Sequence, residues 1–240
     1  MYEYTVGIIA EGHTDVAIIK AVLKVSFPDD VFNFRQIFPS PKELSNQRSP
    51  EGFGWGGVYR VCRDLREKIA MLPDMYDFFI VHVDGDVAYK QYNSIGEQPL
   101  EEDLPCASEL NPIQENGQKF RTVVEKWVGN ISLPIVFCLP FMCTETWVGN
   151  WLYPSDWGNI SENTPDEDIY HHLFLLGQPK REKERRLIRK HGNEMRKVTK
   201  NYRAAADLLT QSAWKDVMQR YVQAYRFHAD LKRTMNADEG

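Results

Sequence analysis

The sequence predicts an α/β protein with a central, mostly parallel sheet flanked by helices, followed by a helical C-terminal extension. In the first 155 residues, short runs of β-branched and aromatic residues alternate with segments of helical periodicity. Beyond that point strand patterns become rare and helical patterns dominate. Strands that alternate with helices are joined by right-handed crossovers into a parallel sheet. We therefore expect an α/β domain at residues 1–155 and a helical extension, at residues 156–240, packed on it.

Two strands and a helix are expected at the start of the chain. Residues 4–10 (YTVGIIA) form a short apolar run, and Val31–Phe38 is a second run that is ended by prolines. Between these runs apolar residues recur at helical spacing, and Thr14 or Asp15 can cap the helix that they predict.

The next part of the chain contains a Gly-rich segment and two apolar runs. Residues 51–57 (EGFGWGG) are expected to form a flexible loop, anchored by Trp55, ahead of a helix at 58–71. The glycines of this loop could also form an N–H nest for phosphate. The runs 77–84 (DFFIVHVD) and 133–139 (LPIVFCL) are nearly continuous in apolar residues, which is typical of strands covered on both faces.

The C-terminal part combines helical periodicity with positive charge. Residues 180–203 carry 11 Lys or Arg against 3 Glu, a local charge of +8 in a chain whose net charge is −5. Such a segment can follow a phosphate backbone, dock an acidic partner or form a solvated helix face, and the acidic remainder of the chain favours binding. The expected helices beyond residue 117 lie at about 120–128, 145–152, 167–176, 182–199, 202–211 and 213–234.

Composition and cysteine usage favour a cytoplasmic protein without a membrane segment. Hydrophobic residues make up 42% and charged residues 26% of the 240 residues, which excludes a wholly disordered, collagen-like or coiled-coil chain. No apolar run approaches the roughly 18–20 residues of a membrane helix, and the first residues do not resemble a signal peptide. No C-x-x-C pair occurs, so we expect four free thiols: Cys62, Cys106, Cys138 and Cys143.

Acidic residues follow three of the expected strands. Glu11 follows the first strand, Asp84-Gly85-Asp86 ends the third, and Glu145 comes six residues after the last. Ligand sites of open α/β sheets form at the carboxyl ends of the strands. Carboxylates that converge there favour Mg²⁺, which binds through one or two carboxylates together with substrate phosphates. Each acidic residue taken alone could equally be a cap or turn residue.

These motifs resemble those of the Toprim domain, the metal-binding fold of topoisomerases, primases, recombination proteins and OLD-type nucleases. The resemblance rests on IIAEGHTD at residues 8–15 and FFIVHVDGD at 78–86, with TETW at 144–147 as a further match. It covers about residues 1–152 and is nearest to the small stand-alone RloB-like and OLD-like proteins of bacterial defence. It implies a metal-dependent nuclease that acts on DNA or RNA in antiviral defence and works with an ATPase partner.

The resemblance also implies a role for individual residues. Glu11 is expected to be a metal ligand or general acid/base, Asp84 and Asp86 to be metal ligands, and Glu145 to be a ligand for a second metal. The implied cofactor is Mg²⁺ or Mn²⁺, as one or two ions. A lysine near the scissile phosphate is implied as well, and Lys200 is the first choice with Lys197 as runner-up.

The remaining residues near these motifs have less specific expectations. Asp15 is adjacent to the site or caps its helix, and His13 is expected to be a polar surface residue. His82 is expected to be a satisfied core histidine rather than a ligand.

Three functions are compatible with the sequence. The leading hypothesis is a nuclease that hydrolyses phosphodiester bonds at a Toprim-like acidic site. The alternative is a non-catalytic interaction or regulatory subunit of an ATPase-containing complex. A third, a small-molecule phosphotransferase or phosphatase with the same metal chemistry, would call for a closed, narrow pocket.

Overall fold

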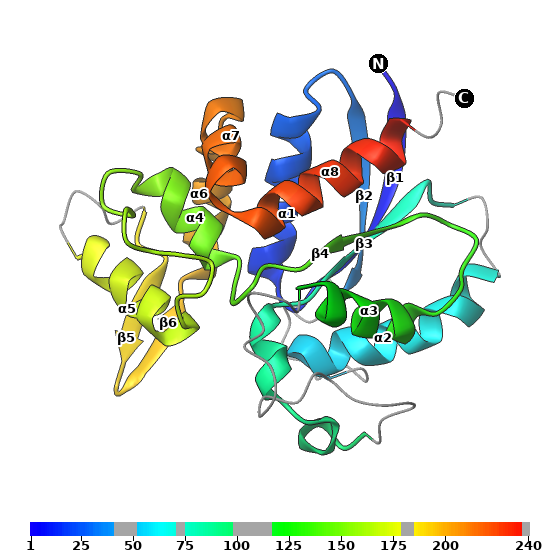
Figure 1. The fold of residues 1–240 in the computed structure, drawn as a ribbon, viewed down its shortest axis with the longest axis horizontal. Helices are drawn as coiled ribbons and strands as arrows, with labels where there is room; N and C mark the ends of the chain where they lie inside the picture. Colours follow the sequence, from blue (N-terminus) through cyan, green and yellow to red (C-terminus); the bar gives the residue numbers. More distant parts are fainter. Residues whose placement is uncertain (41–51, 71–74, 98–116, 179–184, 237–240) are drawn as a thin grey trace.

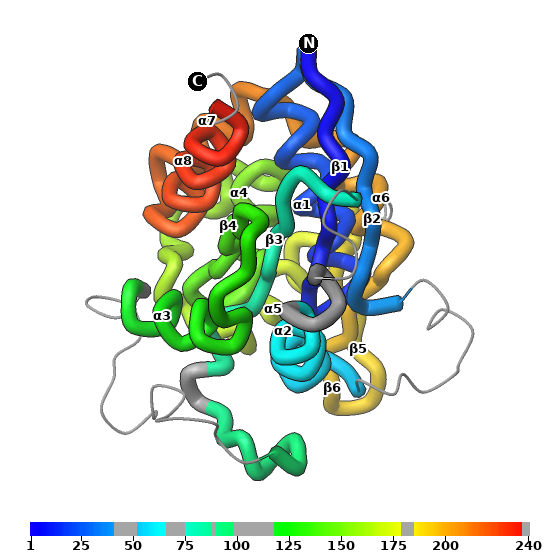
Figure 2. Tube along the Cα trace, turned by 90° about the vertical axis from the view of Figure 1, so that its right-hand side faces the viewer, coloured from blue at the N-terminus to red at the C-terminus, as the bar shows by residue number. Residues whose placement is uncertain are grey.

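The computed structural model describes residues 1–40, 52–70, 75–97, 117–178 and 185–236. Its centre is a four-stranded sheet in which every strand pairs in parallel, in the order β2-β1-β3-β4. Figure 2 shows the strands following one another from β4 to β2. The predicted α/β class, parallel sheet and helical C-terminal segment are thereby confirmed. The strands are β1 (Glu3–Ile9), β2 (Val31–Phe38), β3 (Phe78–His82) and β4 (Ile135–Cys138).

Alternate residues of the central strands face two separate cores. In β3, Phe78 and Ile80 join the larger buried cluster, whereas Phe79 and Val81 join the smaller one. All five residues of this strand are buried. This two-sided burial is the reason that the sequence of the strand is almost wholly apolar instead of alternating.

Helices cover both faces of the sheet (Figure 1). On one face lie α1 (His13–Ser26) and α8 (Val222–Asn236), and on the other lie α2 (Gly54–Ala70) and α3 (Gly117–Val128). In Figure 1 the end of α8 lies beside the start of β1, where Tyr4 Oη donates to the carbonyl oxygen of Met235 at 3.4 Å.

The C-terminal part shares a core with the α/β part. The larger buried cluster runs from Tyr4 in β1 to Met235 in α8. Its elements are α4 (Glu145–Leu152), α5 (Asp166–Leu176), β5 (Ile188–His191), β6 (Glu194–Lys197), α6 (Thr199–Asp207) and α7 (Gln211–Arg220).

The helix expected at residues 182–199 was wrong. The described part of this segment, from residue 185, forms the antiparallel pair β5–β6, in which Ile188 lies opposite Lys197. Gly192 and Asn193 form the two-residue turn, and Gly192 has φ of 62°, a conformation that glycine adopts without strain. The Lys, Arg and Glu residues favour a helix locally, but the hairpin buries Leu187 and Ile188 in the larger cluster.

The Gly-rich segment is also different from the expected loop. Helix α2 begins at Gly54, so most of the glycines lie in its first turn. A Cβ at Gly57 would lie 2.1 Å from the ring of Phe38, so the missing side chain allows the helix to pack closely on β2. Trp55 is buried and stacks on Trp127 with ring centroids 6.3 Å apart. Trp55 is therefore a core aromatic in the first turn of α2 and does not anchor a loop.

No helix among the described residues is long and apolar enough to cross a membrane. Cys62, Cys138 and Cys143 are buried free thiols, and Cys106 lies outside the described residues.

The contact between α4 and the segment that follows it gives a test of this packing. A Cβ at Gly149 would lie 2.1 Å from the fully buried ring of Trp157. Gly→Ala inside a helix ordinarily gains up to about 1 kcal/mol, but overpacking costs about 1–3 kcal/mol. Gly149→Ala should therefore lower the free energy of unfolding in urea by about 1–2 kcal/mol. The control is Gly158→Ala, whose Cβ meets nothing within 4 Å and which should change it by less than about 0.5 kcal/mol. Equal effects of the two substitutions would contradict the packing.

Candidate metal centre

A pocket of about 300 Å³ lies where the carboxyl ends of β1 and β3 meet the start of α1. Five acidic side chains and one lysine line it. The pocket therefore brings Glu11, Asp84 and Asp86 together, as the positions of these residues after neighbouring parallel strands predict. Its charged lining residues are Glu11, Asp15, Asp84, Asp86, Asp166 and Lys197.

Backbone contacts fix the ends of the strands at the pocket. Glu11 Oε1 accepts a hydrogen bond from the backbone N–H of Asp84 at 2.7 Å, which ties the end of β1 to the end of β3. The N–H of Gly85 donates to the carbonyl oxygen of Pro140 at 3.0 Å. A Cβ at Gly85 would lie 1.6 Å from the carbonyl oxygen of Phe141, so only glycine permits this approach. The glycine of the Asp-Gly-Asp motif thus sets the positions of both aspartates.

Asp15 is adjacent to the site and does not cap the helix. Gly12 is the N-cap of α1, and no side chain makes a capping hydrogen bond there. The expectation that Thr14 or Asp15 caps the helix was therefore wrong, because both lie inside its first turn. Asp15 Oδ1 instead accepts a hydrogen bond from Thr144 Oγ1 at 2.7 Å, and the backbone N–H of Thr144 donates to Asp84 Oδ1 at 3.3 Å.

Burial keeps most of these carboxyl groups from ionising easily. It raises the pKa of Glu11 well above its usual value, and the neighbouring Asp84 adds to the effect. Burial likewise raises the pKa of Asp84 to about 6 and that of Asp86 above its usual value. For Asp15 burial acts in the same direction, but the positive charges of Lys197 and His82 outweigh it and hold the pKa low. The pocket therefore holds several carboxyl groups whose ionisation is disfavoured by burial.

His82 lies beneath the acidic residues and is fully buried. Its Nε2 is 3.3 Å from Asp84 Oδ1, and neither ring nitrogen has a well-aligned hydrogen-bond partner. Burial opposes its protonation, but the carboxylates of Asp15 and Asp84 prevail and raise the pKa of the ring to about 9. One ligand atom from each of Asp15, His82 and Asp84 lies within 4.8 Å of the others, so the three could hold a metal if the ring were neutral. As an imidazolium, His82 is a counter-charge and not a ligand.

Glu145 lies deeper than the other acidic residues and does not line the pocket. Its side chain is fully buried, and Oε1 lies 2.7 Å from both Lys197 Nζ and Tyr202 Oη. Its Oε2 has no hydrogen-bond partner. The structure thus makes Glu145 the ion-pair partner of Lys197, and its role as a ligand of a second metal stays a prediction.

Of the two lysines proposed from the sequence, the structure brings Lys197 to the site. Lys197, at the end of β6, lines the pocket, whereas Lys200 is exposed in the first turn of α6 and does not line it. Burial would lower the pKa of Lys197, but Glu145 and Asp15 prevail and raise it well above its usual value, so the side chain is charged.

Sequence reasoning missed Asp166 and Tyr170, which line the pocket from α5. Asp166 begins that helix and is followed by two further acidic residues. Acidic residues are common in the first turn of any helix, so this pattern carries no sign of a site.

The donor set fits a hard divalent cation. Carboxylate oxygens are the ligands that Mg²⁺ and Mn²⁺ prefer. The thiol of Cys143 also lines the pocket, but burial raises its pKa well above the usual value, so it is not the thiolate that zinc would select. Among the described residues, only Asp15, His82 and Asp84 bring one ligand atom each within 4.8 Å of the others. Glu11 and Asp86 line the same pocket as Asp84 but do not belong to that group.

Comparison of the chain with protein-family models, with curated proteins and with solved structures gives no match. The function of the site therefore follows from the chemistry of the residues that line it.

The pair formed by Lys197 and Glu145 can be tested by unfolding. Lys197→Met leaves the fully buried Glu145 without its cation, and breaking a buried ion pair costs about 3–5 kcal/mol. The double variant Lys197→Met/Glu145→Gln should lose less than the sum of the single losses, as measured in urea. Lys200→Met, an exposed matched control, should change the free energy of unfolding by less than about 0.5 kcal/mol. If Lys197→Met costs no more than Lys200→Met, the pair contributes nothing.

Metal binding can be tested without any assay of activity. A ligand at about 100 times its Kd stabilises by about 2.7 kcal/mol, which corresponds to a rise in Tm of about 5 °C or more for a chain of this size. We expect Mg²⁺ or Mn²⁺ to raise the Tm of the wild type relative to EDTA.

Asp86→Asn should abolish this rise while leaving the Tm in EDTA equal to or above that of the wild type, because burial raises the pKa of Asp86 even though its partly exposed ion pair with Lys90, at 3.2 Å, acts in the opposite direction. Asp216→Asn, on the exposed side of α7, is the matched control and should keep the rise. A wild-type Tm that neither metal changes would argue against the centre.

Proposed function

We propose that the chain is a metal-dependent phosphodiesterase that hydrolyses nucleic acid. The observation that carries the proposal is the pocket at the ends of the parallel strands, which five acidic side chains and Lys197 line together. Carboxylates for a divalent cation together with a fixed positive charge are what phosphoryl-transfer chemistry requires. The parallel sheet and the two acidic motifs also agree with the resemblance to Toprim nucleases.

The roles of the residues follow from their positions. Glu11, Asp84 and Asp86 would hold Mg²⁺ or Mn²⁺, and the ion, when bound, supplies activation of a water and stabilisation of negative charge. Glu11 uses Oε1 to accept the N–H of Asp84, so Oε2 is the oxygen for a ligand or proton-transfer role. Glu145 holds the charged Lys197 at the pocket, where its ammonium can stabilise charge on the phosphoryl oxygens.

The alternative is a non-catalytic subunit that uses the same scaffold to bind a partner. A role in antiviral defence and an ATPase partner are expected only from the resemblance to Toprim proteins. Both are compatible with the nuclease and with the non-catalytic subunit. Metal-dependent cleavage distinguishes the nuclease from the non-catalytic subunit. A non-catalytic subunit would not cleave nucleic acid, and it would keep its fold and its partner after substitution of the charged residues of the pocket.

The test is cleavage of plasmid, single-stranded DNA and total tRNA by the purified chain with Mg²⁺, Mn²⁺ or EDTA. We expect cleavage only with metal, and a loss of about 100-fold or more in Asp84→Asn and in Lys197→Met. The matched controls Asp216→Asn and Lys200→Met should retain the wild-type rate. Cleavage that persists in EDTA or in Asp84→Asn would contradict the proposal.

A further inference from the structure

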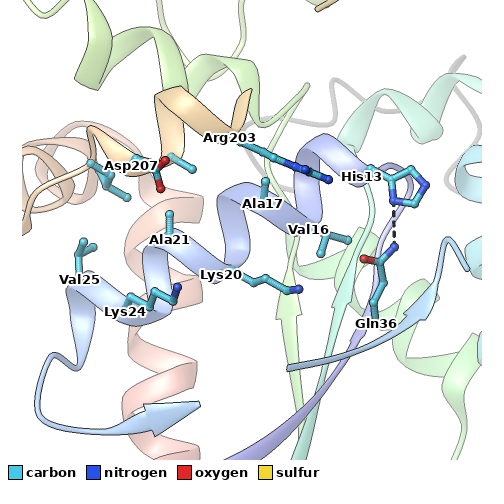
Figure 3. Close-up of a pocket in the computed structure, with 12 residues that line it drawn as sticks. His13, Val16, Ala17, Lys20, Ala21, Lys24, Val25, Gln36, Arg203 and Asp207 are labelled. Carbon is cyan, nitrogen blue, oxygen red and sulfur yellow. Dashed lines mark hydrogen bonds between the residues drawn. The ribbon is translucent and has the colours of Figure 1, made fainter. Parts of the chain in front are cut away.

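A second and larger hollow lies beside the acidic pocket. It has a volume of about 710 Å³ and runs between α1 and α6 (Figure 3). Its floor is made by small and apolar side chains such as Ala17, Ala21 and Leu209. The full lining consists of His13, Val16, Ala17, Lys20, Ala21, Lys24, Val25, Gln36, Arg203, Ala206, Asp207 and Leu209. We call it the α1–α6 groove.

Three cations line this groove without ion-pair partners. Lys20 and Lys24 lie one turn apart on α1, and Arg203 reaches in from α6 (Figure 3). Within the described part of the chain none of the three forms an ion pair, and Lys20 has only an aromatic contact, with its Nζ 5.4 Å from the ring centroid of Phe34. Burial, together with the charges of Lys24 and Arg203, lowers the pKa of Lys20, so the cations oppose one another. An anion in the groove would relieve this repulsion.

The groove and the acidic pocket share the first turn of α1. Gly12, Thr14 and Asp15 line the pocket, whereas His13 and Val16 line the groove. His13 Nδ1 accepts a hydrogen bond from Gln36 Nε2 at 3.0 Å, which fixes the ring at this junction. A chain lying in the groove is thereby directed toward the acidic residues.

We propose that the α1–α6 groove binds the phosphate backbone of a single nucleic-acid strand through Lys20, Lys24 and Arg203. The inference rests on the proposed function and names the path by which its substrate reaches the pocket. The two lysines are separated by about 6 Å along the helix, so they form a track and not a single anion cradle. The groove lies between α1 and α6, which contact each other, and a single strand is the occupant whose backbone follows a positively charged groove of this kind. The chain has a net charge of −5, so its binding of a polyanion depends on local groups of cations, of which this groove is one and the segment at 180–203 is another.

Binding is measured by fluorescence anisotropy in EDTA, so that cleavage does not interfere. The ligands are labelled oligothymidylate and oligouridylate of about 16 nucleotides, the upper range of site sizes for single-strand binding domains. The triple variant Lys20→Gln/Lys24→Gln/Arg203→Gln should bind at least about tenfold more weakly and reduce the slope of log Kobs against log[salt] by about 2.

The matched control removes three cations elsewhere. Lys119 and Lys126 are exposed on α3, across the sheet from the groove, and Lys215 is exposed on α7. The variant Lys119→Gln/Lys126→Gln/Lys215→Gln has the same net charge as the groove variant and should bind like the wild type. Thermal unfolding of both variants checks that they are folded.

Several results would overturn the inference. The inference fails if the wild type does not bind the oligomers, or if both triple variants weaken binding equally. It also fails if a duplex of the same length binds more tightly than the single strand. A groove-dependent affinity for phosphatidylserine vesicles or inorganic triphosphate, without affinity for the oligomers, would overturn it as well. The failure of the inference is distinguishable from that of the proposed function. Groove-dependent binding without cleavage under any metal would support the binding groove and contradict the proposed nuclease activity. Cleavage at limiting substrate that the groove variant does not slow would support the nuclease activity and contradict the role of the groove.

Discussion

The burial of several carboxyl groups in one small pocket is the constraint on which the rest of the structure depends. Glu11, Asp84 and Asp86 all have raised pKa values there, so the folded chain holds these groups at a cost in free energy. The charge of the buried His82 offsets part of that cost at Asp84, and the charge of Lys197 does so at Asp84 and Asp86. Backbone N–H groups offset another part by donating to Glu11 Oε1 and Asp84 Oδ1. Buried carboxyl groups of this kind are typical of functional centres, because a bound cation favours the ionised form that burial disfavours.

The C-terminal part belongs to the site and is not an accessory. Lys197 reaches the pocket only because β6 follows the hairpin turn at Gly192, and α6 then brings Tyr202 onto the same oxygen of Glu145. The indole of Trp151 donates to the carbonyl oxygen of Ala205 at 3.2 Å and joins α4 to α6 a turn further on. The division at residue 155 that the sequence suggests therefore separates the acidic half of the site from its lysine, and a chain cut there would lose the cation.

The sequence predicted the parts of the fold that depend on local pattern and missed those that depend on tertiary packing. The four strands of the sheet lie within one or two residues of the apolar runs, and Glu11, Asp84 and Asp86 meet because parallel strands end at the same edge. The β5–β6 hairpin was read as a helix because its charged residues are good helix formers, although the Gly-Asn pair is a hairpin turn. Of the two candidate lysines, Lys197 lies at the pocket because the hairpin places it there, and a sequence interpreted as a helix could not distinguish it from Lys200. The pairing of Lys197 with Glu145 and the charge of His82 depend on burial, which spacing along the chain does not record.

Helix α1 connects the two charged regions of the molecule. Its N-terminus, where the helix dipole is positive, faces the acidic pocket, and Asp15 occupies the first turn as that dipole favours. The dipole alone also accounts for Lys24 in the last turn, since cations are stabilised at a helix C-terminus. It does not account for Lys20, which lies mid-helix, partly buried and beside Lys24 and Arg203. A like-charged, half-buried lysine lowers the stability of the unliganded chain. An anion bound in the α1–α6 groove, whose lining shares the first turn of α1 with the acidic pocket, would offset that cost.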